Sequence, residues 1–307
     1  MTPYHVPVLL AETLDLLEIK EDGVYVDVTF GGGGHSRALL ARLKQGKLIA
    51  FDRDPDARRN IPDDPRIIFI PQNFALIESA LEARDIKKID GLIADLGISS
   101  HQIDTAERGF SYRFEAQLDM RMNPTDGQTA ADILNSYEER DLVHLFSKYG
   151  EVNNAKKLVR TVIEGRRREE IRETSQFEGM IQACIPPKRR AKYLAQVYQA
   201  LRIEVNGEME ALQNLLLASV KLLNPGGRIA VMSYHSLEDR LVKRFFRSGN
   251  LLGVQHKDLY GRLLSPWKVI TRKAVMADEA EVERNPRARS ARLRVAERQL
   301  LNEELID

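Results

Sequence analysis

Gly23-Val-Tyr-Val-Asp-Val-Thr-Phe-Gly-Gly-Gly-Gly-His-Ser36 is the stretch around which the chain is organised. Valines at positions 24, 26 and 28 alternate with other side chains, which is typical of a β-strand. After the four glycines, the apolar residues between Ala38 and Leu43 follow helical spacing. The stretch therefore predicts a strand, a glycine loop and a helix, the opening unit of an α/β fold.

The glycine loop indicates a ligand. Glycine adopts backbone angles that other residues rarely reach, and it lets another group approach closely because it has no Cβ. In such a unit the ligand lies beyond the carboxyl end of the strand, near the free amides of the helix. A second apolar run, residues 48–51, ends on Asp52, where an acid can accept both hydroxyls of a ribose. These features favour a nucleotide-like ligand over a tight turn without one.

The identity of that nucleotide stays open at this point. The G-x-G-x-x-G pattern of dinucleotide-binding proteins needs a small third residue near position 36 or 37, where this chain has Ser36 and Arg37. Dinucleotides and S-adenosylmethionine both place a ribose on an acid such as Asp52.

The composition is that of a globular protein without an internal disulfide. The chain has 307 residues, 43% of them hydrophobic, and its single cysteine is Cys184. We find no export signal and no run of about eighteen apolar residues, so we expect a cytoplasmic protein that makes no membrane contact. The formal net charge is only +1, so attraction to nucleic acid has to come from local patches.

Further apolar runs predict the rest of one sheet. Strands are expected at 67–70, 89–94 and 229–232, with two antiparallel edge strands at 267–272 and 291–296, and a helix is expected to begin at Pro7. Phe74 follows the third strand, where it can stack on an adenine ring or belong to the core. Asp95 ends the fourth strand and brings another acid to the edge that carries Asp52.

Helical signals replace the strand pattern after Gln102. Capping-box spacing occurs at Ser136 with Glu139 and at Ser175 with Glu178, and Ser236 with Asp239 is spaced as a later cap. The sequence therefore predicts an α/β, Rossmann-like domain formed by residues 1–103 and 212–307. Residues 104–211 are expected to form an inserted, all-helical domain.

Two segments are strongly basic. Residues 153–205 contain twelve Lys and Arg against six Asp and Glu, with clusters at 166–168 and 188–190. Residues 284–298 contain six arginines and one acid. Such clusters are usually solvated helix faces, but Tyr193, Tyr198 and Arg202 follow the second cluster and are expected to add stacking contacts, which favours binding to a polyanion.

Eight motifs, in order along the chain, resemble the MraW/RsmH family of bacterial S-adenosylmethionine-dependent methyltransferases, which modify a cytosine amine in small-subunit ribosomal RNA. The motifs are His5-Val-Pro-Val-Leu-Leu-Ala-Glu12, Thr29-Phe-Gly-Gly-Gly-Gly-His-Ser36, Asp95-Leu-Gly-Ile-Ser-Ser100 with Gln102 and Asp104, Arg108-Gly-Phe-Ser111, Leu118-Asp-Met-Arg-Met122, Ala200-Leu-Arg-Ile-Glu-Val-Asn206, Ser233-Tyr-His-Ser-Leu-Glu-Asp-Arg240 and Asn285-Pro-Arg-Ala-Arg-Ser-Ala291. The resemblance covers essentially the whole chain.

The resemblance implies an rRNA (cytosine-N4-)-methyltransferase that acts on 16S ribosomal RNA, free or in the 30S particle. It also implies S-adenosyl-L-methionine as cofactor, the helical domain as the RNA-recognition part, and no metal. By this similarity the cofactor's methionine end is lined by Gly33, Gly34 and His35, its ribose is held by Asp52, its adenine by Phe74, and the remaining wall is formed by Asp95 and Gln102.

The sequence departs from the family pattern at three places. Tyr234 stands where Phe is usual, His101 where Pro is common, and residues 188–199 differ from the commoner form. The last of these differences lies in the basic segment that is expected to contact RNA.

The implied chemistry requires positioning above all. A sulfonium methyl is already electrophilic, so neither a metal nor a covalent nucleophile is needed. The cytosine amine is a poor nucleophile, and a hydrogen-bond acceptor on its N–H assists attack. The turn 95–100 lies at the correct edge for that acceptor, but its carboxylate, hydroxyls and carbonyls all qualify, so no catalytic residue is assigned.

Two other classes of function remain at this stage. An NAD-dependent oxidoreductase uses a similar fold, although the glycine spacing disfavours it. A ribosome-assembly factor without catalysis can also keep the fold.

Overall fold

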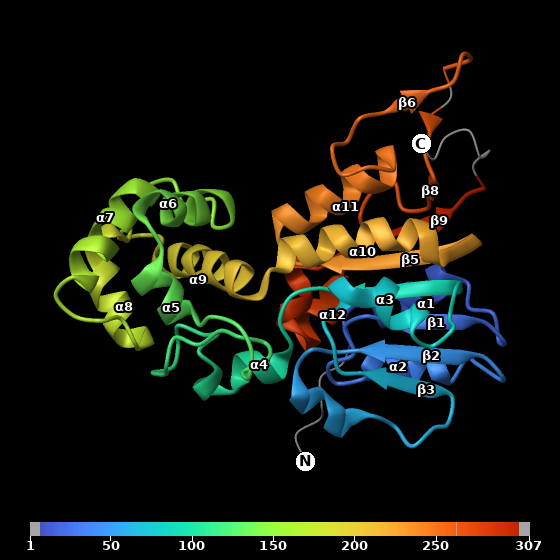
Figure 1. Cartoon of the computed structure of the whole chain (residues 1–307), viewed down its shortest axis with the longest axis horizontal. Coiled ribbons are helices and arrows are strands. Elements are labelled where there is room, and N and C mark those ends of the chain that lie inside the picture. The colour runs from blue at the N-terminus through green and yellow to red at the C-terminus, as the bar shows by residue number, and fades with distance from the viewer. Residues whose placement is uncertain (1–6, 262, 301–307) are drawn as a thin grey trace. The chain divides into compact units, whose positions relative to one another are not determined.

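The computed structural model describes residues 7–261 and 263–300, and it divides into two units (Figure 1). Unit 1 comprises Met1–Gly97 and Met209–Asp307, and unit 2 comprises Ile98–Glu208. These divisions fall a few residues from the domain boundaries that we expected at 103/104 and 211/212. His5 and Val6, which open the first motif, lie outside the described residues.

Unit 1 is built on a seven-stranded sheet in the order β3-β2-β1-β4-β5-β9-β8. The strands are β1 (Val24–Asp27), β2 (Lys47–Phe51), β3 (Ile67–Ile70), β4 (Ile89–Asp95), β5 (Leu223–Ser233), β8 (Trp267–Val269) and β9 (Arg292–Arg298). The pairs from β3 to β5 are parallel, whereas β9 runs antiparallel to both β5 and β8. This topology confirms the predicted Rossmann-like fold and its antiparallel edge.

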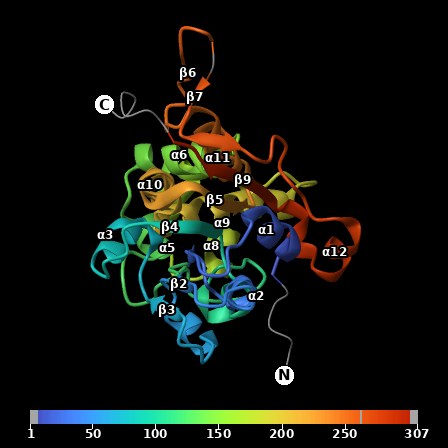
Figure 2. The same cartoon turned by 90° about the vertical axis from the view of Figure 1, so that its right-hand side faces the viewer.

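Helices cover both faces of this sheet (Figure 2). One face packs against α1 (Leu10–Leu17) and α2 (Gly34–Leu40), and the other against α3 (Ile77–Glu82), α10 (Glu208–Leu222) and α11 (Ser236–Ser248). Successive strand residues point to opposite faces, so Val26 joins the second layer and its neighbour Tyr25 the first. Both faces are therefore buried, which explains the nearly continuous apolar runs of the parallel strands.

Short elements complete unit 1. They are the 3₁₀ turns η1 (Pro55–Asn60), η2 (Phe74–Leu76) and η5 (Pro286–Ser290), the helix α12 (Glu279–Arg284), and a separate hairpin of β6 (His256–Lys257) and β7 (Leu263–Leu264). No helix in the described part of the chain is both long and apolar enough to cross a membrane.

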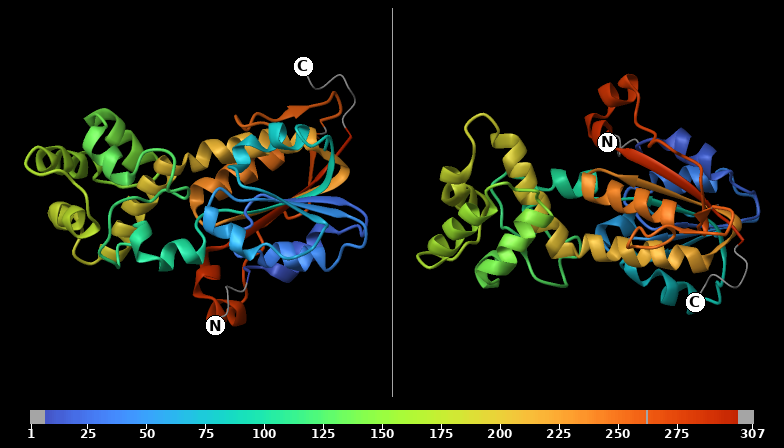
Figure 3. Two further views of the ribbon diagram at one scale, coloured as in Figure 1. Left: turned by 60° about the horizontal axis from the view of Figure 1, so that its bottom comes forward. Right: turned by 90° about the horizontal axis from the view of Figure 1, so that it is seen from above.

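Unit 2 is helical apart from one bridge between Gln117 and Glu173. Its elements, which run from green to yellow in Figure 3, are α4 (Ser100–Asp104), η3 (Ala106–Arg108), α5 (Ala130–Ser136), α6 (Glu139–Lys148), α7 (Ala155–Arg166), α8 (Thr174–Ile181), η4 (Gln182–Cys184) and α9 (Arg190–Asn206). They enclose a core of their own around Phe146, Phe177 and Leu201. Cys184 belongs to this core.

The helix starts differ from several predicted ones. Ser136 is the last residue of α5 and donates to the Asp132 carbonyl, and Ser175 lies inside α8. The capping boxes are instead Ser99 with Gln102, Thr129 with Asp132, and His235 with Glu238. The first helix begins at Leu10 and not at Pro7, because Leu9 has a left-handed backbone with φ of 51°. The spacing of a serine and an acid alone thus does not locate an N-cap, because the capping residue must also have an extended backbone directly before the helix.

The predicted stacking residues of α9 are not available to RNA. Tyr193 and Tyr198 are only 5% and 4% exposed and pack in the core of unit 2. Arg202 forms a bidentate ion pair with Glu208. The prediction of stacking by these three residues was therefore wrong, because the apolar face of α9 includes the aromatic rings.

A buried amide holds two motifs of unit 2 together. Asn206, at the end of α9, accepts from the Met122 amide at 2.8 Å and donates to the Met120 carbonyl at 2.8 Å. Met120 has a φ of 60°, which is uncommon for a side chain of this size. Arg108 adds bonds to the carbonyls of Arg121 and Met122. These motifs therefore serve the fold of unit 2.

Replacing this amide should destabilise the protein. Asn206→Ala leaves a buried N–H and a buried carbonyl without this partner, so we expect a loss of about 2 kcal/mol or more in the free energy of unfolding. Chemical denaturation measures it, and Asn153→Ala, at an exposed position, is the control. Equal stability of the two variants would contradict the proposed role of Asn206.

Candidate functional site

Acids stand at the carboxyl ends of three neighbouring strands in unit 1. Asp27 ends β1, Asp52 follows β2, and Asp95 ends β4. Asp27 pairs with Ala50 of β2 and with Ile93 of β4, so the parallel register brings all three acids to the same edge of the sheet. This is the edge at which open α/β sheets bind ligands.

The glycine loop between β1 and α2 lies at this edge as well. Gly31 and Gly33 have φ of 50° and 71°, which favours glycine. A Cβ on Gly34 would lie 2.2 Å from Pro7 Cγ, so close packing against Pro7 requires that glycine. At Gly31 the nearest described atom to a Cβ would be the Thr29 oxygen, 3.9 Å away. The loop therefore presents open backbone at Gly31 and packed backbone at Gly34.

Asp52 is anchored to this loop. Its Oδ2 accepts from the Gly31 amide at 2.7 Å, and its Oδ1 accepts from the Asp54 amide at 2.8 Å. Burial raises the pKa of Asp52 to about 6, against these two hydrogen bonds, which lower it. A carboxylate oxygen has more than one acceptor site, so Asp52 keeps the capacity to accept from a ligand. The carboxylate is therefore preset in one orientation.

Asp27 is a site residue that the sequence reasoning missed. Its side chain is 1% exposed and accepts from Ser36 Oγ at 2.7 Å and from the Thr29 amide at 3.1 Å. Burial raises the pKa of Asp27. Thr29 Oγ1 in turn accepts from the Asp95 amide at 2.7 Å. An acid at the end of the first strand, inside an apolar run, was the available signal.

Asp95 is oriented by Tyr234, one of the positions at which the sequence departs from the expected family pattern. The Tyr234 hydroxyl donates to Asp95 Oδ1 at 2.6 Å. Burial, followed by the negative charge of Asp95, raises the pKa of Tyr234 well above its usual value, so this hydroxyl stays protonated as a donor.

His35, in the first turn of α2, lies close to the Asp95 carboxylate. Its Nε2 donates to the Val8 carbonyl at 3.1 Å, and its Nδ1 lies 4.0 Å from Asp95 Oδ2. The ring is 7% exposed. The Val8 bond orients the ring so that Nδ1 faces Asp95.

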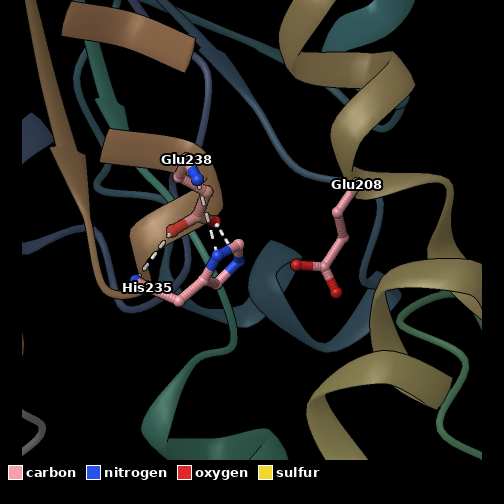
Figure 4. A group of neighbouring side chains, drawn as sticks. All are labelled: Glu208, His235 and Glu238. Atoms are coloured by element: carbon pink, nitrogen blue, oxygen red, sulfur yellow. Dashed lines mark hydrogen bonds and ion pairs between the residues drawn. The ribbon is translucent and has the colours of Figure 1, made fainter. Parts of the chain in front are cut away.

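The turn after β5 is fixed by a buried pair, His235 and Glu238 (Figure 4). Glu238 Oε1 lies 3.2 Å from His235 Nε2, and Glu238 Oε2 accepts from the Tyr234 amide at 2.9 Å. The third side chain drawn, Glu208, belongs to unit 2, where it pairs with Arg202. The pair in unit 1 thus positions the backbone of Tyr234.

Two predicted site residues lie further from this network. Phe74, in η2, is partly buried and packs against the core, which leaves both of its predicted roles open. Gln102 belongs to unit 2, where its side chain accepts from the Ser99 amide in the cap of α4. Their contacts with a cofactor stay predictions.

Part of the arginine-rich segment is structural. Arg294 Nε and Arg292 Nη1 bind the Asp239 carboxylate at 2.6 and 3.0 Å. Burial alone raises the pKa of Asp239, but the hydrogen bonds and charges of the two arginines hold it below its ordinary value. Arg292 and Arg294 therefore tie β9 to α11.

The mostly parallel sheet with antiparallel β9, the glycine loop and the acid after β2 define a Rossmann-like, nucleotide-binding type of domain. Residues 2–299 match the model of the MraW methylase family, and the chain belongs to that family. It is therefore a methyltransferase, and the oxidoreductase alternative is excluded.

Relatives with high identity carry one name. The chain is 50% identical over 296 residues to "Ribosomal RNA small subunit methyltransferase H" of Bacteroides thetaiotaomicron, covering 96% of this chain and 97% of that protein. It is 53% identical over 298 residues to the protein of the same name from Cytophaga hutchinsonii, covering 96% and 100%. A solved structure of a putative methyltransferase from Streptococcus mutans in complex with SAH is 13% identical, with 96% and 99% covered and a TM-score of 0.41. A structural similarity this low does not bear on function.

The Tyr234 hydroxyl is open to a direct test. Tyr234→Phe removes its bond to Asp95, whose side chain is 25% exposed, so we expect a loss of about 1 kcal/mol in the free energy of unfolding. Methyl transfer should stay within a few-fold of wild type, because Phe keeps the aromatic ring in place and removes only the hydroxyl. Denaturation and single-turnover assays measure the two effects. Unchanged stability would show that the bond contributes nothing.

Proposed function

We propose that this protein transfers a methyl group from S-adenosyl-L-methionine to the exocyclic amine of a cytidine in small-subunit (16S) ribosomal RNA, in the cytoplasm and without a metal. The observation that carries the proposal is the near-complete alignment with relatives named small-subunit rRNA methyltransferases, at about half of all positions identical. The cytosine specificity rests on the resemblance of the motifs.

The edge of unit 1 fits the proposed cofactor. Asp52 is preset by two amides, which suits an acceptor for ribose hydroxyls, and Gly31 beside it has space for a ligand. We assign Gly33, Gly34 and His35 to the methionine end and Phe74 to the adenine. Asp95 and Gln102 are assigned to the remaining wall, as the resemblance implies. When bound, S-adenosylmethionine supplies a methyl group on a positively charged sulfur, which needs no further activation.

The chain's own residues then have to orient the acceptor base. Correct orientation of two reactants can contribute on the order of 7 to 11 kcal/mol. Asp95, whose carboxylate is held by Tyr234, is one acceptor at this edge for an N–H of the cytosine amine. Its hydrogen bond would keep the nitrogen lone pair directed at the methyl group. To reach the site, the base has to leave its stack.

The decisive assay uses labelled S-adenosylmethionine with small ribosomal subunits and with protein-free 16S RNA. We expect incorporation into at least one of these substrates, and the preferred one separates an assembled particle from naked RNA. Cofactor binding without turnover on either would contradict the proposal and favour the alternative of a non-catalytic assembly factor.

The pKa of Asp52 predicts a pH dependence of cofactor binding. The ionised carboxylate accepts both ribose hydroxyls, whereas the protonated form loses acceptor capacity, so the Kd for S-adenosylmethionine should rise as pH falls through about 6. Asp52→Asn should bind roughly tenfold more weakly at pH 8 and lose this dependence. Calorimetry measures both, with Asp63→Asn, an exposed acid of the same unit, as the control. If wild type and Asp52→Asn showed the same pH dependence of the Kd, Asp52 would not belong to the cofactor site.

Exposed arginines of unit 2 are proposed to contact RNA phosphates. Arg167 and Arg168 are exposed and form no ion pair in the described part of the chain, whereas Arg166 is half-buried and donates to the Leu134 carbonyl. Two of the three arginines in the cluster 166–168 are therefore available to contact phosphates.

We expect Arg167→Gln with Arg168→Gln to lower the slope of log binding constant against log salt by about 1.4 on single-stranded RNA. The control is Arg140→Gln with Arg172→Gln, because both of these arginines already pair with an acid. Equal slopes in the two double variants would show that residues 167 and 168 are a solvated helix face.

A further inference from the structure

The outer face of α11 is basic. Residues 240–257 contain five Lys and Arg and no Asp or Glu. Lys243, Arg244 and Arg247 follow the i, i+3 and i+4 spacing of one helix face, and all three are exposed. None of the three forms an ion pair within residues 7–261 and 263–300. The opposite face of α11 is buried, with Phe245 and Phe246 against Trp267.

The β6–β7 hairpin lies next to this face and carries exposed apolar side chains. Figures 1 and 2 show it extending beside α11. Tyr260 is 87% exposed and Leu259 fully so, and Leu252 precedes the hairpin at 83%. Lys257, in β6, adds a cation. The hairpin segment therefore offers exposed apolar side chains beside the basic face of α11.

A close contact joins the helix to the hairpin segment. Gly253 has a φ of 78°, and a Cβ built on it would lie 2.4 Å from Arg244 Cδ. The stem of Arg244 therefore packs on Gly253. We call Lys243, Arg244, Arg247, Lys257 and Tyr260 the α11–hairpin surface.

We propose that the α11–hairpin surface binds unpaired RNA, as an interface of unit 1 that is separate from the cofactor edge. Lys243, Arg244 and Arg247 form no ion pair among the described residues and match phosphates, whereas Lys257 is followed by Asp258. The exposed Tyr260 ring offers a face on which a base stacks. A protein partner would favour a continuous apolar patch, whereas here the apolar side chains lie beside these cations. This inference rests on the proposed RNA substrate and adds a second place where that RNA is held.

The test compares two triple variants of the full chain. Lys243→Gln, Arg244→Gln and Arg247→Gln remove three charges, and glutamine at 244 keeps most of the stem on Gly253. The control replaces with Gln three exposed lysines outside this surface, Lys47 at the start of β2 and Lys87 and Lys88 just before β4. Binding to protein-free 16S RNA and to small subunits is measured over a range of salt, together with methyl transfer.

We expect the first variant to lower the salt slope by about 2 and to raise KM with kcat and cofactor affinity unchanged, while the control matches wild type. Tyr260→Ala should weaken RNA binding roughly tenfold. Wild-type slopes in the first variant would overturn the inference. Weaker binding to subunits but not to protein-free RNA would assign the surface to a protein and overturn it too. If wild type binds RNA but methylates none of these substrates, the proposed function is wrong. The inference about this surface is then still tested by the salt slopes of the two triple variants.

Discussion

The buried carboxylate of Asp27 is the constraint on which the candidate site depends. A charge removed from water needs hydrogen-bond donors, and Asp27 has the Ser36 hydroxyl and the Thr29 amide. Ser36 belongs to α2, and Thr29 in turn accepts from the Asp95 amide of β4. One group thus ties the end of β1 to the helix after the glycine loop and to the neighbouring strand. The loop that presents Gly31 to Asp52 is held at both ends by this network.

The sheet could be predicted from sequence because burial on both faces leaves continuous apolar runs, and the strand at 67–70 was placed without error. The starts of the helices could not be predicted in this way, because a serine three residues before an acid caps a helix only where the backbone enters that helix. In α11 the N-cap is His235, one residue before the predicted Ser236. Asp27 was missed because an acid in an alternating strand suggests a solvent-facing position. The prediction that Tyr193 and Tyr198 are exposed for stacking was wrong, because a basic sequence does not reveal which face of its helix is buried.

The motifs that identify the family have different physical roles. The glycine loop and Asp95 lie at the edge of unit 1 where we propose that the cofactor binds, whereas Asn206 and Arg108 hold the loop around Met122 inside unit 2. Arg292 and Arg294, which follow the arginine-rich motif, pin β9 through Asp239. A basic residue therefore supports a role in RNA binding only where it is exposed and lacks an acidic partner.

Mass mapping of the nucleosides in 16S RNA after reaction tests the central claim most directly. RNA from cells that lack the protein would be treated with the enzyme and S-adenosylmethionine, digested, and analysed by tandem mass spectrometry. The account predicts one new methyl group, on the exocyclic nitrogen of a cytidine. A methyl group on a ring atom, on ribose or on another base would contradict it, as would an unmodified RNA when cofactor binding is intact.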